Sequence, residues 1–325
     1  MVTLREVAQA ADVSTSTASR AWSHPQAVST QARAKILAVA DSLGYVPGKR
    51  ASSRRMGNLA LVVPDIANPF FPPFIKAAQR HAMLRNFSLF LADTDEDPRN
   101  ERQILSDLIP QVDGVLLCSS RLTDDEIYRL QREEVRIVLL NRLIGGIPSV
   151  LIDTGDGMRQ AIDHLAKLGH KSVVYVSGPA SSWSDAERQR SIRNRARDHG
   201  IELHTFGPYI PDFQAGLNVA DSAIAAGATA ILTYDDIIAL GVITRLADRG
   251  VRVPADVSVI GCDDIAAAGM YRPPLTTIHS SFESAATAAI DLLVESVTSP
   301  LVHQYDPVIV PSQLVIRATT STAKD

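Results

Sequence analysis

The stretch that most clearly indicates how the chain begins to fold is VTLREVAQAADVSTSTASRAW, residues 2–22. Thr3 and Glu6 have the spacing of a capping box, in which each side chain bonds the other residue's backbone amide at a helix start. Apolar residues follow at helical spacing, and Asp12 then predicts a tight turn. Ser14 is placed to cap a second helix, from Thr15 to Trp22. The stretch therefore predicts two short helices joined by a turn.

The second predicted helix is poor in large apolar side chains. It carries small, hydroxylated and cationic residues, namely Ser14, Thr15, Ser16, Thr17, Ser19 and Arg20. One interpretation is a solvated surface helix. The other is a helix slim enough to enter the major groove of DNA, where hydroxyls meet phosphates and base edges and Arg20 forks onto a guanine.

A third helix is predicted directly downstream. Ser29 is placed to cap it, apolar residues continue at helical spacing to Leu43, and Gly44 and Pro47 end it. Residues 2–22 and the following VSTQARAKILAVADSLGYVP, residues 28–47, resemble the headpiece of the lactose-repressor/galactose-repressor (LacI/GalR) family of bacterial regulators. The resemblance continues to about residue 317. It implies a helix-turn-helix DNA-binding domain at 1–47, with contacts to DNA from Thr3, Ser14, Thr15, Ser16, Thr17, Arg20 and Ser29.

The charge distribution agrees with a nucleic-acid partner for the head only. The chain of 325 residues carries a net charge of -4, yet residues 1–58 hold eight Lys and Arg against three acids. The remainder is therefore acidic. A small basic head on a larger acidic body is the asymmetry expected when only the head meets phosphate.

A basic, polar segment, GKRASSRRMGN, covers residues 48–58. By composition it is a flexible linker. In the resembled family the corresponding hinge folds on DNA and wedges leucines into the minor groove. Here Arg54 stands near the place of that leucine, the segment is about three residues short, and Met56 is the apolar side chain available as a wedge. The resemblance implies DNA contacts from Lys49, Arg50, Arg54, Arg55 and Met56, but leaves the central kink open.

Beyond the hinge, short apolar runs alternate with amphipathic stretches. Runs such as LALVV at 59–63, GVLLC at 114–118 and AILT at 230–233 are hydrophobic throughout, as suits parallel strands buried on both faces. The alternation predicts a doubly wound α/β fold. The length favours two lobes, and the resemblance implies a two-lobed effector domain of the type I periplasmic-binding-protein kind over 59–325. Its first lobe is expected at 59–152 plus a helix at 284–297, and its second at 153–280 plus the tail strands.

Ligands of open α/β sheets bind beyond the carboxyl ends of the strands, so polar groups there are candidates. After the first strand, Asn68, Phe70 and Phe71 match an amide and a ring-stacking face in the resembled proteins, although adjacent aromatics are often core. Ser119 follows the third strand. Asn141 and Arg142 follow the fourth, where Arg142 is expected either to bridge ring hydroxyls or to pair with a surface acid.

The second lobe contributes further candidates. GPASSWSDAERQR, residues 178–190, resembles the loop that delivers an arginine into the family's cleft; Arg188 fits best and Arg190 is the competing assignment. Asp235 stands where the family usually has Asn, which removes a donor and adds a charge. VSVIGCDDIAAAGMYRPPLTTI, residues 257–278, supplies Asp263 as the hydroxyl-binding carboxylate, and Ser280 replaces a longer amide. An arginine opposed to a carboxylate beside aromatic faces is how a polyol is held, so the expected effector is sugar-like or nucleoside-like.

Other functional classes are disfavoured by the sequence. No GxGxxG after a strand, GxxxxGK[ST], GxSxG or HExxH motif occurs, which argues against an enzyme. A solute-binding receptor for sugar uptake remains the alternative, opposed by the basic head and the lack of a signal sequence or apolar span. Because one recognition helix reads few base pairs, we expect a homodimer on a pseudo-palindromic operator. Cys118 and Cys262 lack disulfide or metal spacing, as in a cytoplasmic protein without cofactors.

Overall fold

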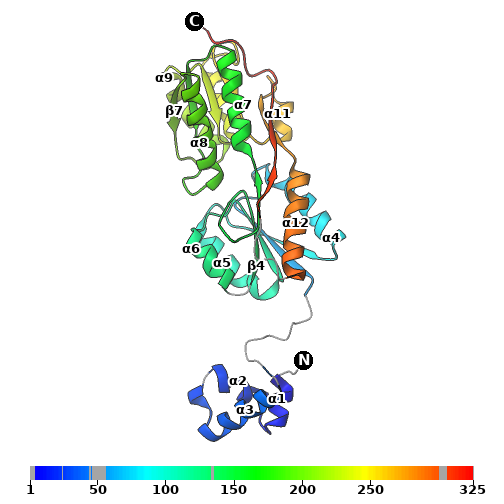
Figure 1. Cartoon of the computed structure of the whole chain (residues 1–325). Helices are drawn as coiled ribbons and strands as arrows, with labels where there is room; N and C mark the ends of the chain where they lie inside the picture. Colours follow the sequence, from blue (N-terminus) through cyan, green and yellow to red (C-terminus); the bar gives the residue numbers. More distant parts are fainter. Residues whose placement is uncertain are drawn as a thin grey trace. The chain divides into compact units, whose positions relative to one another are not determined.

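The computed structural model describes residues 4–23, 25–43, 45, 56–132, 135–299 and 306–324. The chain forms two compact units, Met1–Met56 and Gly57–Asp325 (Figure 1). This boundary falls within the segment predicted as a hinge, 48–58, and most of that segment, residues 48–55, lies outside the described residues.

The first unit is a small three-helix headpiece. It contains α1 (Leu4–Ala10), α2 (Thr15–Ser23), the 3-10 turn η1 (Pro25–Ala27) and α3 (Thr30–Ser42). Val7, Ala11, Ala21, Ile36 and Ala40 form its core. These helices confirm the predicted ones to within a residue or two.

The predicted caps of the headpiece can be compared with the structure. The Thr17 amide donates to Ser14 Oγ at 3.0 Å, and the Ala32 amide donates to Ser29 Oγ at 3.3 Å. Asp12 has φ +55°, which forms the predicted turn between α1 and α2. Thr3 of the capping box lies outside the described residues.

The first lobe of the second unit is a parallel six-stranded sheet in the order β11-β5-β4-β3-β1-β2. Its strands are β1 (Asn58–Val63), β2 (Ser88–Asp93), β3 (Gly114–Cys118), β4 (Arg136–Leu140), β5 (Ser149–Ile152) and β11 (Val308–Val310). One face packs on α4 (Phe71–Leu84) and the late helix α12 (Phe282–Thr298), and the other on α5 (Pro98–Leu108) and α6 (Asp124–Arg132). Both faces are therefore covered, as the hydrophobic strands predict.

The second lobe is a parallel four-stranded sheet in the order β7-β6-β8-β9. Its strands are β6 (Ser172–Val176), β7 (Glu202–Phe206), β8 (Ala230–Thr233) and β9 (Ser258–Ile260). On one face lie α7 (Thr154–Lys167) and α8 (Trp183–Asp198), and on the other α9 (Phe213–Ala225) and α10 (Asp236–Asp248), with the short α11 (Ala266–Met270). An antiparallel pair, β10 (Thr277–Ser280) and β12 (Ser312–Val315), completes the lobe.

The chain passes between the lobes three times, after β5, after β10 and after β11. The Asp153 amide donates to the Val310 carbonyl at 2.9 Å, so two of these crossings are hydrogen-bonded side by side. Three connections of this kind suit a hinge between two otherwise rigid bodies. No helix in the described part of the chain is long and apolar enough to cross a membrane.

Three predictions about this unit were wrong. The hydrophobic run SLFLA at 88–92 has the same pattern as the three runs named above and is likewise predicted to be buried on both faces. In the structure, however, β2 is an edge strand and exposes Phe90 and Leu91. The tail strands were assigned to the second lobe, yet β11 joins the first sheet beside β5. The loop expected at 178–190 becomes helical at Trp183, where Ser182 caps α8.

Candidate functional site

The headpiece presents one candidate surface on α2. Ala18 and Ala21 are fully buried against the other helices, which turns the remaining side chains of α2 outward. Ser14, Thr15, Ser16 and Arg20 are exposed and Thr17 is half-buried. The structure thus gathers the predicted hydroxyls and the arginine on one accessible helix.

Some of these hydroxyls have a structural role as well. Ser14 Oγ caps α2 and lies 2.8 Å from Ser16 Oγ and 2.7 Å from Thr17 Oγ1. Ser29 is exposed and caps α3. Met56 is half exposed, whereas Thr3, Lys49, Arg50, Arg54 and Arg55 lie outside the described residues.

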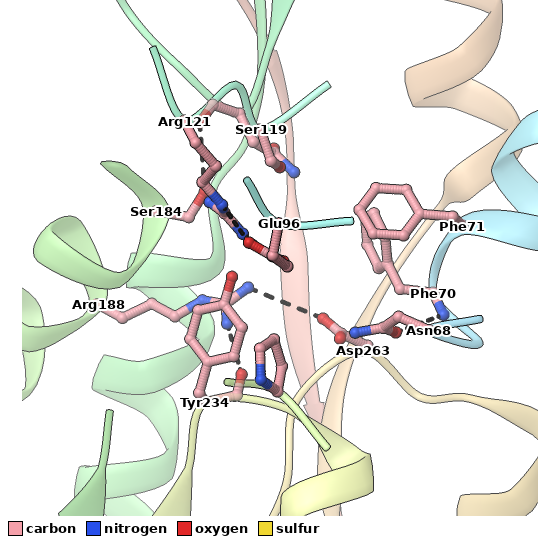
Figure 2. A pocket seen from close by; sticks show the side chains of 12 residues that line it. Asn68, Phe70, Phe71, Glu96, Ser119, Arg121, Ser184, Arg188, Tyr234 and Asp263 are labelled. Carbon is pink, nitrogen blue, oxygen red and sulfur yellow. Dashed lines mark hydrogen bonds and ion pairs between the residues drawn. The ribbon is translucent and has the colours of Figure 1, made fainter. Parts of the chain in front are cut away.

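The second candidate site is a pocket between the two lobes of the larger unit (Figure 2). The first lobe contributes Asn68, Phe70, Phe71, Glu96, Ser119, Arg121 and Asn141, and the second contributes Ser184, Arg188, Pro211, Tyr234 and Asp263. The cavity between them is only about 30 Å³. That volume admits a water molecule or two, so a sugar-sized ligand requires the lobes to part.

The aromatic wall of the pocket comes from the start of α4. Phe70 and Phe71 meet edge to face at 4.9 Å between ring centroids, and Phe70 meets Phe282 of α12 at 5.1 Å. Both residues are largely buried in the first-lobe core and also line the pocket. The prediction of an aromatic face and the competing prediction of core packing therefore both describe these rings.

Asn68 connects the two lobes. Its Oδ1 accepts from the Phe70 amide at 3.0 Å, and its Nδ2 donates to Asp235 Oδ2 at 3.2 Å. Asp235 in turn caps α10 by accepting from the Ile238 amide at 2.9 Å. Asp235 is buried and does not line the pocket, but it holds a side chain that does.

Arg188 is the central cation of the second lobe. It is buried, and its guanidinium carbon lies 4.7 Å from the centroid of the Tyr234 ring. Its Nε donates to Thr154 Oγ1 at 2.9 Å, and its Nη1 donates to the Tyr234 carbonyl. Its Nη2 lies 3.8 Å from Asp263 Oδ1, which is an ion pair without a hydrogen bond. Arg190, the competing assignment, is exposed and pairs with Glu187 at 2.8 Å.

Burial shifts the ionisation of the acids around Arg188. Desolvation raises the pKa of Asp263 to about 7, against the opposing effect of Arg188. Desolvation likewise raises the pKa of Asp235 to about 6. Burial opposes the charge of Arg188, but the acidic groups Cys262 and Asp263 outweigh it, and its pKa is raised. Perturbed groups gathered in one cleft are typical of a functional site.

Four of the lining residues have a left-handed backbone. Glu96, Ser119, Asn141 and Asp263 have φ values of +55°, +46°, +56° and +111°. Such conformations are unfavourable for residues with a Cβ atom and persist where the surrounding structure enforces them. Ser119, Asn141 and Asp263 follow β3, β4 and β9, where the strand ends were predicted to place the site.

Besides Asp235, two more of the predicted effector residues do not line the pocket. Arg142 is buried and points away from the pocket, donating to the carbonyls of Ser120 and Leu122 and pairing with Asp124 at 2.6 Å. Its role is to hold the loop after β3, so the ion-pair alternative was the better one. Ser280 is buried in the β10–β12 pair and does not line the pocket.

Five lining residues were missed: Glu96, Arg121, Ser184, Pro211 and Tyr234. Arg121 and Glu96 could have been found, because they follow β3 and β2 at the same sheet edge as the residues that were chosen. Ser184 and Pro211 carry no comparable signal, since α8 and the loop before α9 bring them to the cleft.

Comparisons with known proteins agree with both units. Residues 3–48 match the model described as bacterial regulatory proteins, lacI family, and residues 162–320 match a periplasmic binding protein-like domain. The HTH-type transcriptional regulator DegA of Bacillus subtilis is 30% identical over 288 residues, covering 85% of this chain and 86% of DegA.

Solved structures resemble the whole chain. The transcriptional regulator CelR in complex with cellobiose matches with a TM-score of 0.74 and 26% identity, over 98% of this chain and 100% of that one. The lac repressor dimer bound to operator and the anti-inducer ONPF matches with a TM-score of 0.73 and 26% identity, over 98% and 99%. DegA is 30% identical over most of both chains, and residues 3–48 match the lacI headpiece. The chain therefore belongs to the lacI family of bacterial transcription regulators.

Proposed function

We propose that the protein is a repressor that binds a specific operator and is controlled by a small sugar-like or nucleoside-like effector. The observation that carries this proposal is the presence, in one chain, of an exposed hydroxyl and arginine helix and a separate charged pocket between two lobes. Neither feature alone requires regulation. Together they provide one site for DNA and one for a ligand, which is what allosteric control needs.

The DNA-binding part of the proposal rests on α2. Arg20 reads a base edge and the hydroxyls of Ser14, Thr15, Ser16 and Thr17 contact phosphates and bases in the major groove. The proposed domains are a DNA-binding domain at 1–47, a hinge at 48–58 and an effector domain at 59–325. In the hinge, Lys49, Arg50, Arg54 and Arg55 add phosphate contacts, and Met56 takes the place of a wedging leucine. The lac repressor structure bound to operator supports this assignment by likeness.

The effector part rests on Arg188, Asp263 and the two phenylalanines. Charged groups give directional hydrogen bonds to hydroxyls, and Phe70 and Phe71 offer a face for the C–H side of a ring. The cellobiose complex of CelR, a similar structure, supports a carbohydrate as the effector class. Because the cleft is nearly closed, effector binding changes the lobe angle and thereby the affinity for DNA, by about 1–3 kcal/mol.

A homodimer is proposed through the larger unit. Met83 and Leu84 of α4 are 71% and 72% exposed, and Phe90 and Leu91 on the neighbouring edge strand β2 are 46% and 45% exposed. An open strand edge beside an apolar patch is a surface that a second copy covers. Two copies then present two α2 helices to a pseudo-palindromic operator, in the cytoplasm where the DNA is. Sedimentation at micromolar concentration should show a dimer, and a monomer there would contradict this part.

The experiment that tests the function measures operator selection and ligand response in the same protein. Operator fragments are selected from random DNA by the full chain, and their affinity is measured with and without a panel of sugars and nucleosides. A specific fragment whose affinity changes with one ligand class supports the proposal. Deletion of residues 1–58 distinguishes a regulator from the alternative, a solute-binding receptor. A receptor would keep its whole function, whereas a regulator would lose DNA binding.

A further inference from the structure

The pocket contains a cation that the family resemblance did not suggest. Arg121 follows β3 in the first lobe, and its side chain is only 2% exposed. It faces Arg188, which approaches from α8 of the second lobe (Figure 2). Each lobe therefore contributes one buried guanidinium to the same cavity.

Arg121 has one nitrogen that the protein leaves unused. Its Nε and Nη2 donate to the two carboxylate oxygens of Glu96 at 2.5 and 2.8 Å. Its Nη1 is buried and has no hydrogen-bond partner among the described residues. A guanidinium only donates, so a buried Nη1 requires an acceptor oxygen, and leaving it without one is unfavourable.

The position of Arg121 is held firmly. Its backbone amide donates to the buried carboxylate of Glu101 at 2.9 Å, and Glu96 binds the Nε and Nη2 edge of its guanidinium. Burial opposes the charge of Arg121, but hydrogen bonding to Glu96 outweighs it and raises its pKa; the Tyr234 hydroxyl is nearby without forming a hydrogen bond to Nη1. The side chain is therefore charged and cannot easily turn Nη1 towards the acid it already binds.

Several acceptor oxygens of the pocket are already taken, although the carboxyl of Asp263 remains as an acceptor. The side-chain oxygens of Asn68 and Asn141 accept from the amides of Phe70 and Ile152, at 3.0 and 3.1 Å. Both oxygens of Glu96 are taken by Arg121. Arg188 Nη2, by contrast, has only the long 3.8 Å approach to Asp263. Each wall thus presents one guanidinium, and among the described lining residues only Arg121 Nη1 is a buried donor without a hydrogen-bond partner.

We infer that the effector is an acidic sugar, with a carboxylate or phosphate oxygen that accepts from Arg121 Nη1 while Arg188 and Asp263 hold its hydroxyls. This inference rests on the proposed effector pocket and specifies the class of ligand it takes. A planar carboxylate suits the free side of the guanidinium best, because two oxygens can meet two N–H groups in one plane. Glu96 offsets part of the charge of Arg121, so the expected gain comes mainly from the hydrogen bond that Nη1 donates to a charged oxygen.

The test compares matched neutral and acidic ligands by calorimetry on the full-length protein. The pairs are D-glucose with D-gluconate, D-glucuronate and glucose 6-phosphate, and D-ribose with D-ribonate and ribose 5-phosphate. At least one acidic member should bind at least about tenfold more tightly than its neutral parent, as expected for a charged hydrogen bond. A preference for the sugar acids identifies a carboxylate, and a preference for the phosphates identifies a phosphate.

Variants link that preference to Arg121. Arg121→Gln alone leaves Glu96 unpaired, so Glu96→Gln/Arg121→Gln is made as well, which removes both charges and keeps the size of the pair. In the folded variant the affinity ratio of acidic to neutral ligand should fall to about one. Arg190→Gln, which removes an exposed arginine outside the pocket, is the matched control and should keep the ratio of the wild type.

Two results would overturn the inference. If a neutral sugar binds as tightly as its acidic partners, the pocket is a sugar site and only the inference of an acidic effector is contradicted. If neutral sugars bind and no acidic member does, only the inference is wrong; if neither acidic nor neutral members bind, the sugar-like effector of the proposed function is contradicted as well. Operator binding is measured separately, so the DNA-binding part of the proposal is judged by its own experiment.

Discussion

The headpiece and the two-lobed unit place their candidate residues in opposite environments. In the headpiece, an alanine-rich core leaves Ser14, Thr15, Ser16 and Arg20 exposed. In the two-lobed unit, Arg188, Asp263 and Arg121 are buried, and they come from segments far apart in the chain. Changes in the headpiece should therefore alter binding with little effect on stability, whereas changes in the pocket should alter both.

The largest effect is expected for Arg188→Ala. It removes a buried cation that contacts Thr154, the Tyr234 carbonyl and Asp263, and it leaves a buried carboxylate without its counter-charge. The free energy of unfolding should fall by about 3–5 kcal/mol, measured by urea denaturation of the full chain. Arg190→Ala, two residues along α8 but exposed, should lower it by about 0.5 kcal/mol or less. Equal losses of unfolding free energy in the two variants would contradict the expected difference between a buried and an exposed arginine.

The next effect concerns Asp263 and pH. Because its pKa is raised to about 7, the folded state keeps the proton between about pH 4 and 7 while the unfolded state loses it. This contribution to stability is present at about pH 4 and is lost as the pH rises through 7. Asp263→Asn should thus be more stable than the wild type at pH 8, by up to about 4 kcal/mol, and the difference should shrink towards pH 5.

Melting temperatures of both proteins from pH 5 to 8 provide the measurement. Asp248→Asn, which removes an exposed carboxylate at the end of α10, controls for the general loss of a negative charge. A difference between wild type and Asp263→Asn that stays constant with pH would show that Asp263 is ionised throughout, as it would be in an open, hydrated cleft.

Arg20→Ala tests the exposed helix surface of the headpiece. Loss of a bidentate contact to a guanine should weaken binding to the specific operator by about 1–3 kcal/mol, measured by fluorescence anisotropy. Since Arg20 is exposed, the melting temperature and the response to effector should be unchanged. Arg20→Lys keeps the charge but not the fork, and should retain non-specific binding while losing specificity. Full operator affinity in Arg20→Ala would contradict the assignment of α2 as the reading helix.

The smallest effect is expected for Ser14→Ala. Ser14 caps α2, so its loss should lower the stability of the headpiece by about 1 kcal/mol and also weaken operator binding. Thr15→Ala, at the first residue of the same helix, removes an exposed hydroxyl without removing the cap. Chemical denaturation followed by Trp22 fluorescence measures the headpiece. Equal stability of the two variants would mean that the cap contributes nothing.

Sequence reasoning was most successful where the signal is local. The caps at Ser14 and Ser29, the three headpiece helices and the buried strands β1, β3 and β8 all depend on neighbouring residues and on hydrophobic periodicity. The strand ends placed Asn68, Ser119 and Asn141 at one cleft, because the carboxyl ends of parallel strands meet at one sheet edge. Arg188 and Asp263, which also line this cleft, came from the family resemblance.

Reasoning from the sequence failed where the role of a residue depends on the direction of its side chain and on its hydrogen-bond partners. Arg121 and Arg142 lie near the ends of neighbouring strands and look equivalent along the chain. Arg142 turns inward to hold the loop carbonyls of Ser120 and Leu122, whereas Arg121 turns into the pocket beside Glu96. The sequence carries no sign of this difference, since the direction of a long side chain depends on which acceptors the tertiary structure brings near it.

The amino-acid sequence by itself determined the family, the helix-turn-helix, the two-lobed α/β class and the strand ends that form the cleft. The family follows from the resemblance of several motifs in order, whereas the helices and strands follow from local hydrogen bonding and hydrophobic burial. Only the tertiary structure decided that β2 is an exposed edge, that β11 returns to the first sheet, and that Arg121 keeps an unused nitrogen in the pocket. Strand pairing and the satisfaction of buried donors are long-range properties, fixed when distant segments pack together.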